Sequence, residues 1–366
     1  MILLCAGDVS AEEVGQRDID GGQFIGAIGC RSSSCHGGAG PKRDQYITWS
    51  RQDFHAKALA ILTSARSARI AETLGGGDAQ ANKRCTVCHS PFQTVAPAQL
   101  ASTAHPDEGV SCETCHNAAG SWLRGHTRPD WTYATRVTAG MRDLRSLYVR
   151  ANTCVACHQN IGNELLKAGH PTMVFELDSQ SADEPRHWRD DDPWIGARAW
   201  LTGQAVALRE AAWRSRTDPD PAPDMQETSL ALAWLLAKVT AADPTLPKIS
   251  EPNSSDLEPL QKQADDLARN AARWSPNTDS IMSMLRALAA SDSEFGKITA
   301  SKQALFYRAR RLVLALDRLK VAGYQNNAAP LKIDNDLKLL RDDVGGFDSF
   351  DSASFAGHLR AFRTRL

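Results

Sequence analysis

Hydrophobic residues recur with a helical period along the C-terminal half of the chain. The first such face is formed by Trp194, Ala197, Leu201, Ala205, Leu208 and Ala212. Later segments repeat the pattern over 226–241, 256–273, 278–290, 300–322 and 333–343, with a short one near 352–364. One apolar stripe on each of several helices predicts a helical bundle over residues 191–366.

Capping and linker signals delimit these helices. Asp192 is expected to cap the first helix with Pro193 at its first position, and Ser255 with Glu258 forms a capping-box pattern before the third. The segments DPDPAPD and DPTLPKISEP separate the first three helices.

Two groups of side chains in this half are assigned structural roles. The five tryptophans are expected to pack in the core and between helices: Trp194, Trp200, Trp213, Trp234 and Trp274. The basic turn of Arg308, Arg310 and Arg311 is expected to face solvent.

The N-terminal half shows neither a strand-like alternation nor long helical periods. Glycine pairs and triplets interrupt it at 21–22, 37–38 and 75–77. We therefore expect a mainly α-helical protein in two parts: a loop-rich domain over 22–190 that a cofactor helps to fill, and the bundle over 191–366. The boundary lies near EPRHWRDDDPW.

Composition narrows the function classes. The 366 residues are 42% hydrophobic and 23% charged, as in ordinary globular proteins. A net charge of −1 gives no basic surface for nucleic acid, and no apolar run approaches the roughly 18 residues of a transmembrane helix. Cysteine and histidine are unevenly distributed along the chain: eight of nine cysteines and nine of ten histidines lie between Cys30 and His187.

The first residues, 1–11, have the composition of the end of a secretory signal. Cleavage after Ala11 would remove Cys5, so that every remaining cysteine would belong to a motif described below. An exported, periplasmic or extracellular protein is expected.

Three segments have the form C-x-x-C-H. They are Cys85, Cys88 and His89 in CTVCH, Cys112, Cys115 and His116 in CETCH, and Cys154, Cys157 and His158 in CVACH. Two cysteines one helical turn apart can each add a thiol across one vinyl group of a porphyrin, and the following histidine then lies under the iron. Zinc ribbons and thioredoxin-like sites also use C-x-x-C pairs, but neither explains a histidine after every second cysteine.

A fourth site, CRSSSCH, has four residues between Cys30 and Cys35 and ends in His36. Either both cysteines form thioethers across a bulged loop, or Cys35 alone does so, because Ser32 stands where the first cysteine is usually found. With this site the chain would carry four haems c.

The histidines divide into two groups by position. His36, His89, His116 and His158 are expected to be the proximal iron ligands. His55, His126 and His170 are the best candidates for the opposite axial positions, followed by His105 and His187, whereas His358 is expected to be a surface residue.

The motif order CRSSSCHGG, YITWSRQDFHAKAL, CTVCH, GVSCETCH and CVACHQN…AGHPTMVFEL resembles the tetrahaem cytochrome c-554 family. The resemblance covers residues 22–190. It implies closely stacked haem pairs, mostly with two histidine ligands, one iron that can stay five-coordinate, and a role in electron transfer linked to hydroxylamine oxidation. The widened first motif and the extension from residue 191 depart from the family pattern.

Two functions remain open. The leading interpretation is an electron carrier between other redox proteins or quinol-oxidising complexes, with the helical half as a docking module or cover. The alternative is a reductase or oxidase of a small nitrogen or sulfur compound at one open iron. The second or third motif would hold that iron, with His105 and His187 as its ligand or as proton donors. A structural subunit of a larger redox complex is a third interpretation.

Overall fold

The computed structural model describes residues 22–40, 43–218, 220–221, 224–251, 257–297, 300–324 and 331–366. It divides into two units: one runs to Met173 and takes up Ser181–Arg189, and the other comprises Val174–Gln180 and Asp190–Leu366. The signal-like segment 1–11 and Ser255 of the expected capping box lie outside the described residues.

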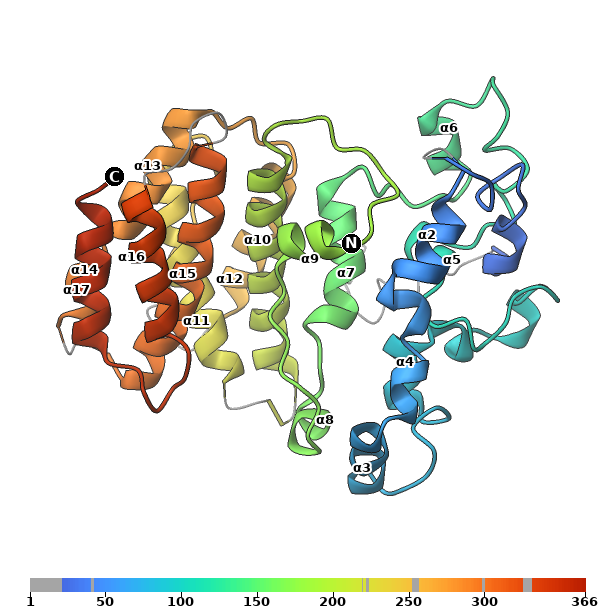
Figure 1. The fold of residues 1–366 in the computed structure, drawn as a ribbon, viewed down its shortest axis with the longest axis horizontal. Helices are drawn as coiled ribbons and strands as arrows, with labels where there is room; N and C mark the ends of the chain where they lie inside the picture. The colour runs from blue at the N-terminus through green and yellow to red at the C-terminus, as the bar shows by residue number, and fades with distance from the viewer. Residues whose placement is uncertain are drawn as a thin grey trace, which may run out of the picture. The chain divides into compact units, whose positions relative to one another are not determined.

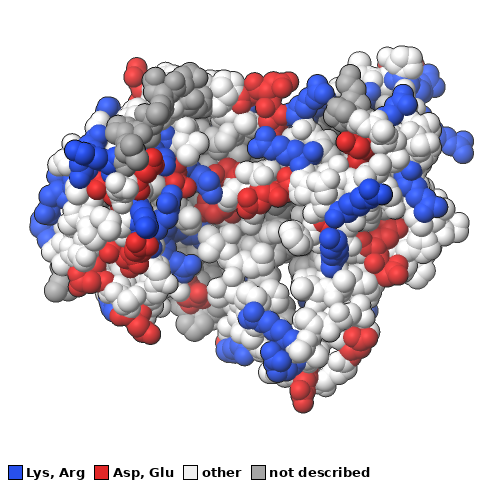
Figure 2. All heavy atoms as spheres, viewed as in Figure 1, with Lys and Arg blue, Asp and Glu red and all other residues white. Residues whose placement is uncertain are grey.

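The described residues form helices and loops without a β-strand, apart from one isolated bridge between Phe24 and Leu100 (Figure 1). The prediction of a mainly α-helical protein is confirmed. No helix in the described part of the chain has the length and apolar character needed to span a bilayer. On the face drawn in Figure 2, acidic and basic side chains are interspersed, in keeping with the net charge of −1.

The second unit is a bundle of helices that begin and end close to the predicted limits. Its helices are α10 (Ile195–Thr217), α11 (Met225–Ala242), α12 (Glu258–Ala271), α13 (Thr278–Ala289), α14 (Asp292–Phe295), α15 (Lys302–Gly323), α16 (Leu331–Asp343) and α17 (Ser352–Arg363). Helix α10 packs on α11 and α12, and α11 packs on α13 and α15. The core includes Trp200 and Trp234, each almost fully buried, as expected for these tryptophans.

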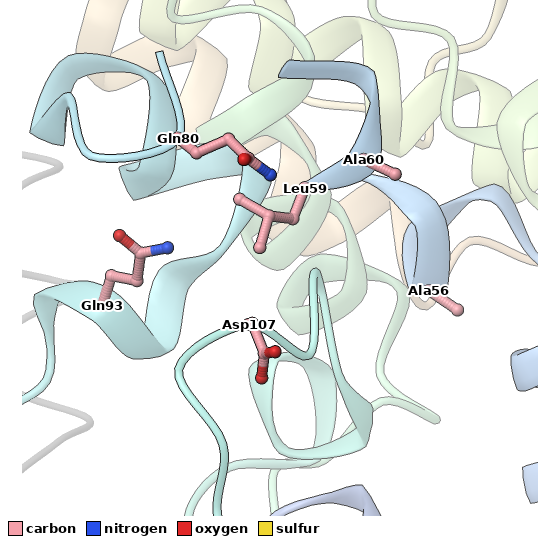
Figure 3. Close-up of a pocket in the computed structure, with 6 residues that line it drawn as sticks. All are labelled: Ala56, Leu59, Ala60, Gln80, Gln93 and Asp107. Carbon is pink, nitrogen blue, oxygen red and sulfur yellow. The ribbon is translucent and has the colours of Figure 1, made fainter. Parts of the chain in front are cut away.

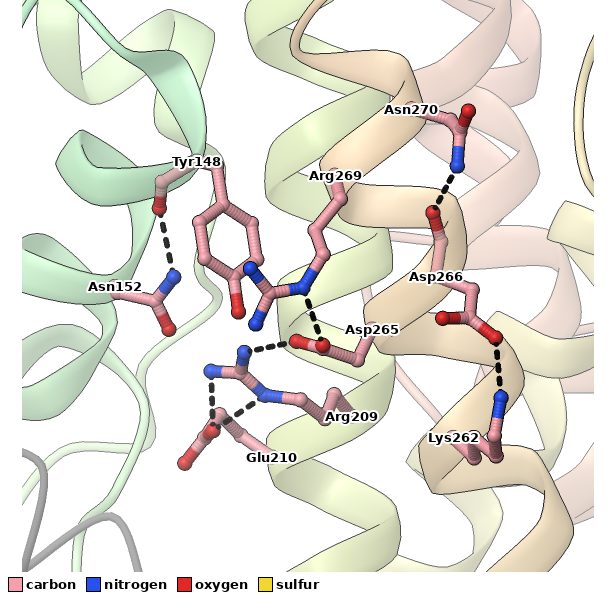
Figure 4. A network of polar contacts seen from close by, with 9 residues as sticks. All are labelled: Tyr148, Asn152, Arg209, Glu210, Lys262, Asp265, Asp266, Arg269 and Asn270. Atoms are coloured by element: carbon pink, nitrogen blue, oxygen red, sulfur yellow. Dashed lines mark hydrogen bonds and ion pairs between the residues drawn. The ribbon is translucent and has the colours of Figure 1, made fainter.

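Charged side chains on α10 and α12 are joined in one network (Figure 4). The guanidinium of Arg209 donates to Glu210 and, at 2.7 Å, to Asp265, which also accepts from Arg269 at 2.8 Å. Because Arg209 is largely buried, these bonds offset the cost of removing its charge from water.

The start of α10 differs from the expectation. Pro193 is not its first residue: the helix begins at Ile195, and Trp194 is the N-cap residue without a side-chain cap. The Asp192 carboxylate accepts from the Trp194 N–H at 2.8 Å, and its carbonyl accepts from Ile195. Asp192 therefore closes a turn that precedes the helix, and its carboxylate also pairs with Arg198.

The expected solvent-facing position of Arg311 is wrong. Arg311 is 7% exposed and pairs with the buried Glu176 at 3.4 Å. Glu176 belongs to the short segment that joins the bundle from the first half of the sequence, together with Leu177 at the start of α9 (Leu177–Asp183). A Cβ on Gly203 of α10 would lie 2.8 Å from that of Leu177, so the glycine permits this close approach. The boundary between the units is therefore interleaved rather than a single point near residue 190.

The first unit has short helices and a small apolar core. Its α-helices are α2 (Gln45–Gln52), α3 (Ala65–Thr73), α4 (Lys83–His89), α5 (Cys112–His116), α6 (Tyr133–Thr138), α7 (Leu147–His158) and α8 (Asn163–Lys167). Its 3-10 turns are η1 (Ala27–Cys30), η2 (Phe54–Lys57), η3 (Ala60–Thr63), η4 (Pro91–Thr94) and η5 (Pro97–Gln99). Two apolar clusters, one around Phe92 and one around Leu62, are too small to organise a unit of this size unaided.

Candidate haem-binding sites

Each C-x-x-C-H segment is the last turn of a helix that ends on its histidine. Helix α4 ends at His89, α5 at His116 and α7 at His158. The Asn82 side chain caps α4 by accepting from Arg84, and Ser146 caps α7 by accepting from Val149. Two cysteines three positions apart lie on one face of such a turn. Attachment of both thiols to one porphyrin requires this arrangement.

The first motif reaches a similar arrangement by a different path. The turn η1 ends at Cys30, and the loop then folds back so that the His36 N–H donates to the Cys30 carbonyl at 3.2 Å. In a regular helix this bond would join residues four apart. The loop is tight, because a Cβ on Gly37 would lie 1.8 Å from the Arg31 carbonyl oxygen.

Every expected proximal histidine has one other histidine ring facing it. The ring centres are 6.2 Å apart for His36 and His126, 6.5 Å for His89 and His170, 6.3 Å for His116 and His187, and 6.0 Å for His158 and His55. Two imidazoles bound on opposite sides of one iron, each at about 2 Å, have ring centres roughly 6 Å apart. The four pairs fit the spacing of two axial ligands on one iron.

The ring nitrogens are also oriented for metal binding. In five of the eight rings, Nδ1 faces an acceptor within the protein. The acceptors are Gln45 for His36, Asp53 for His55, and the carbonyls of Ala58, Leu123 and Pro171 for His89, His126 and His170. A partner on Nδ1 holds the ring and leaves Nε2 as the nitrogen able to bind iron.

Burial favours the neutral imidazole that a metal needs. It lowers the pKa of His116 to about 4, and it lowers the pKa of His89 and of His158 as well. The same cause lowers the pKa of His126 and His187. His55 differs from these five, because its hydrogen bond to Asp53 raises its pKa.

His105 is not one of the paired histidines. Its side chain is exposed, and its backbone N–H donates to the Glu108 carboxylate at 3.0 Å. His187, one of the two weaker candidates, faces His116 of the third motif, and His170 faces His89 of the second. His358 lies in the bundle and pairs with Asp343, away from the motifs in sequence.

The four motifs adjoin one another in two pairs. A hydrogen bond between the Cys30 and Cys112 thiols lowers the pKa of Cys30 and raises that of Cys112. A second hydrogen bond, between the Cys88 and Cys157 thiols, lowers the pKa of Cys88 and raises that of Cys157. The first motif is therefore beside the third, and the second is beside the fourth.

Several polar residues of this region carry no signal in the sequence. The Glu113 side chain, between the two cysteines of the third motif, is 2% exposed and accepts from the N–H groups of Ile25, Gly26 and Ala119 at 2.6–3.1 Å. These bonds join the segment at Ile25 and Gly26 to helix α5. Gln45 and Asp53 are likewise recognisable only once their histidine partners are known, since a lone polar residue in a loop has no distinguishing pattern.

A cavity is lined by residues that lie on either side of the second motif in the sequence (Figure 3). Its volume is about 450 Å³, and its lining residues are Ala56, Leu59, Ala60, Gln80, Gln93 and Asp107. Gln80 and Gln93 flank α4 in the sequence, and the Ala58 carbonyl nearby accepts from His89. Leu59 points into this space (Figure 3).

Comparison with known proteins agrees with the geometry of these motifs. Residues 30–117 match the family model described as cytochrome c554 and c-prime. No curated protein and no solved structure matches the chain. The matched stretch contains the first three motifs and the histidines between them. This match supports the assignment of residues 30–117 to the cytochrome c554 family, and it indicates a c-type cytochrome with covalently bound haem that is involved in electron transfer.

Proposed function

We propose that the chain is a tetrahaem electron carrier in which all four irons have two histidine ligands. The observation that carries this proposal is the set of four histidine pairs with ring centres 6.0–6.5 Å apart. Thioethers from Cys30 and Cys35, Cys85 and Cys88, Cys112 and Cys115, and Cys154 and Cys157 would hold the four groups.

The chain's own residues would keep the irons closed to substrate. Imidazoles would take both axial positions, five of the eight held through their Nδ1 partners, so no coordination site would be left for a small molecule. Haem supplies reversible one-electron chemistry, and bis-histidine ligation keeps its potential lower than methionine ligation does. These properties suit a carrier better than an enzyme of nitrogen or sulfur compounds.

The contacts between motifs support a linear order of the four groups. The first adjoins the third and the second adjoins the fourth through cysteine contacts. Burial, and after it the nearby Cys115, raises the pKa of Cys154, which indicates that the third and fourth motifs are also neighbours. The proposed path is first, third, fourth, second.

The number and coordination of the haems are tested together on protein produced with the haem-attachment machinery. The pyridine haemochrome assay is expected to give four haems per chain. Low-temperature electron paramagnetic resonance of the oxidised protein is expected to contain low-spin signals alone, and cyanide is expected not to bind. A high-spin signal that disappears on addition of cyanide would favour an open, catalytic iron instead.

Export is part of the same proposal. Haem is attached to such motifs outside the bacterial cytoplasm, so the mature protein would be periplasmic or extracellular, and its donor and acceptor would meet it there. Fractionation of expressing cells is expected to find the haem-loaded protein outside the cytoplasm. Holoprotein in the cytoplasmic fraction would contradict the localisation.

A further inference from the structure

One axial histidine of the four pairs has an acidic partner. Asp53 is 4% exposed, and its Oδ1 accepts both from the His55 backbone N–H at 2.9 Å and from the His55 ring Nδ1 at 3.0 Å. The Glu184 carboxylate lies within 4.8 Å of the same group of atoms. His55 faces His158 of the fourth motif.

The other rings whose Nδ1 partner is known have neutral partners. The Gln45 side-chain amide accepts from His36, and main-chain carbonyls accept from His89, His126 and His170. A carboxylate on Nδ1 makes an imidazole a stronger electron donor than an amide or carbonyl does. The fourth site therefore differs from the first and second sites in charge rather than in ligand type.

Resting on the proposed bis-histidine function, we propose that Asp53 is a positioning residue that lowers the reduction potential of the haem at Cys154 and Cys157. A buried negative charge and a more basic imidazole both stabilise ferric over ferrous iron, since the ferric form carries one more positive charge. Asp53 thereby makes this haem harder to reduce than it would be with a neutral partner. In the proposed path the electron passes from the first site to the third, the fourth and then the second. Because the fourth haem is internal and has a lowered potential, it passes its electron on readily once it is reduced.

The test changes the charge while keeping the hydrogen bond. In Asp53→Asn, the side-chain oxygen can still accept from His55, so the ring stays in place and only the negative charge is lost. Spectroelectrochemical titration is expected to show one midpoint raised by about 59 mV, which is a tenfold change in a one-electron equilibrium. A smaller rise is expected at the third motif, because Asp53 also interacts electrostatically with His187, and the other two midpoints are expected to stay unchanged. One low-spin resonance signal is expected to shift in position.

The matched variant Gln45→Glu makes the opposite change at the first site. Gln45 is the first residue of α2, where an acidic side chain is tolerated by the helix dipole. It is expected to lower a different single midpoint. Both variants changing no midpoint, or Asp53→Asn shifting all four equally, would overturn the inference.

The haem count and the low-spin signals are measured on the same samples. Fewer than four haems or a high-spin iron in the wild type would count against the proposed function itself. Four low-spin haems with unmoved potentials would reject the role of Asp53 alone.

Discussion

The backbone N–H of His36 donates to the carbonyl of Cys30 at 3.2 Å, although six positions separate them. A regular C-x-x-C-H turn joins its first cysteine to its histidine by the same bond over four positions. This bond favours Cys30, rather than Ser32, as the counterpart of the first cysteine, while the Ser32 carbonyl accepts from the Cys35 N–H at 2.8 Å.

Cys30→Ser is therefore expected to remove one thioether and keep the haem through Cys35. The pyridine haemochrome is expected to retain four haems, with about a quarter of its α band moved to longer wavelength, because one vinyl group stays unsaturated. Ser32→Ala is the control and is expected to leave the spectrum of the wild type unchanged. An unaltered band in Cys30→Ser would mean that Cys35 alone is attached.

A second experiment distinguishes the roles of His187 and His105. Because His187 faces His116 at 6.3 Å and His105 faces no motif histidine among the described contacts, His187→Ala is expected to convert one of four low-spin irons to high spin. His105→Ala is expected to leave all four signals as they are. Electron paramagnetic resonance of the oxidised proteins measures both outcomes, and a silent His187→Ala would refute the pairing.

The buried Glu113 is expected to matter for stability. In Glu113→Gln, an NH₂ group replaces one of the two carboxylate oxygens that accept backbone N–H bonds. Two donors then face each other, and a buried N–H is left without an acceptor. The free energy of unfolding is expected to fall by about 2 kcal/mol. Denaturant titration followed by the haem absorption measures it, with the exposed Glu72→Gln as a control that is expected to stay near the wild-type value. Equal midpoints for both variants would contradict this role.

The buried Glu176 predicts a pH dependence of the bundle. Burial raises the pKa of Glu176 from 4.5 to about 7, and Arg311 opposes that shift. Between these two pH values Glu176 is protonated in the native state and ionised in the unfolded state. The stability that the bound proton contributes is therefore full below about pH 4.5 and is lost as the pH rises through about 7. The loss is at most about 3 kcal/mol.

Chemical unfolding followed by far-ultraviolet circular dichroism at pH 5 and pH 8 measures this loss. Glu176→Gln is expected to lose less stability between the two pH values than the wild type. The exposed Glu251→Gln is the control and is expected to follow the wild type. The same slope in Glu176→Gln and the wild type would rule out Glu176 as the source.

The chemistry of the motifs and the helices of the bundle were readable from the sequence because both depend on local spacing. Cysteines three apart with a following histidine need a single helical turn, and an apolar stripe of period 3.6 needs a single helix. Hence α11, α13, α15 and α17 begin and end within two residues of the predicted limits.

The partners of the histidines were decided only by the tertiary structure. His126 follows the third motif in sequence yet faces His36 of the first, and His55, which precedes the second motif, faces His158 of the fourth. Which two rings face each other depends on how distant segments meet, and no local spacing encodes that. The same holds for Asp53 and Arg311: a charged residue in a loop or on a helix reads as solvent-exposed until the fold brings a buried partner to it.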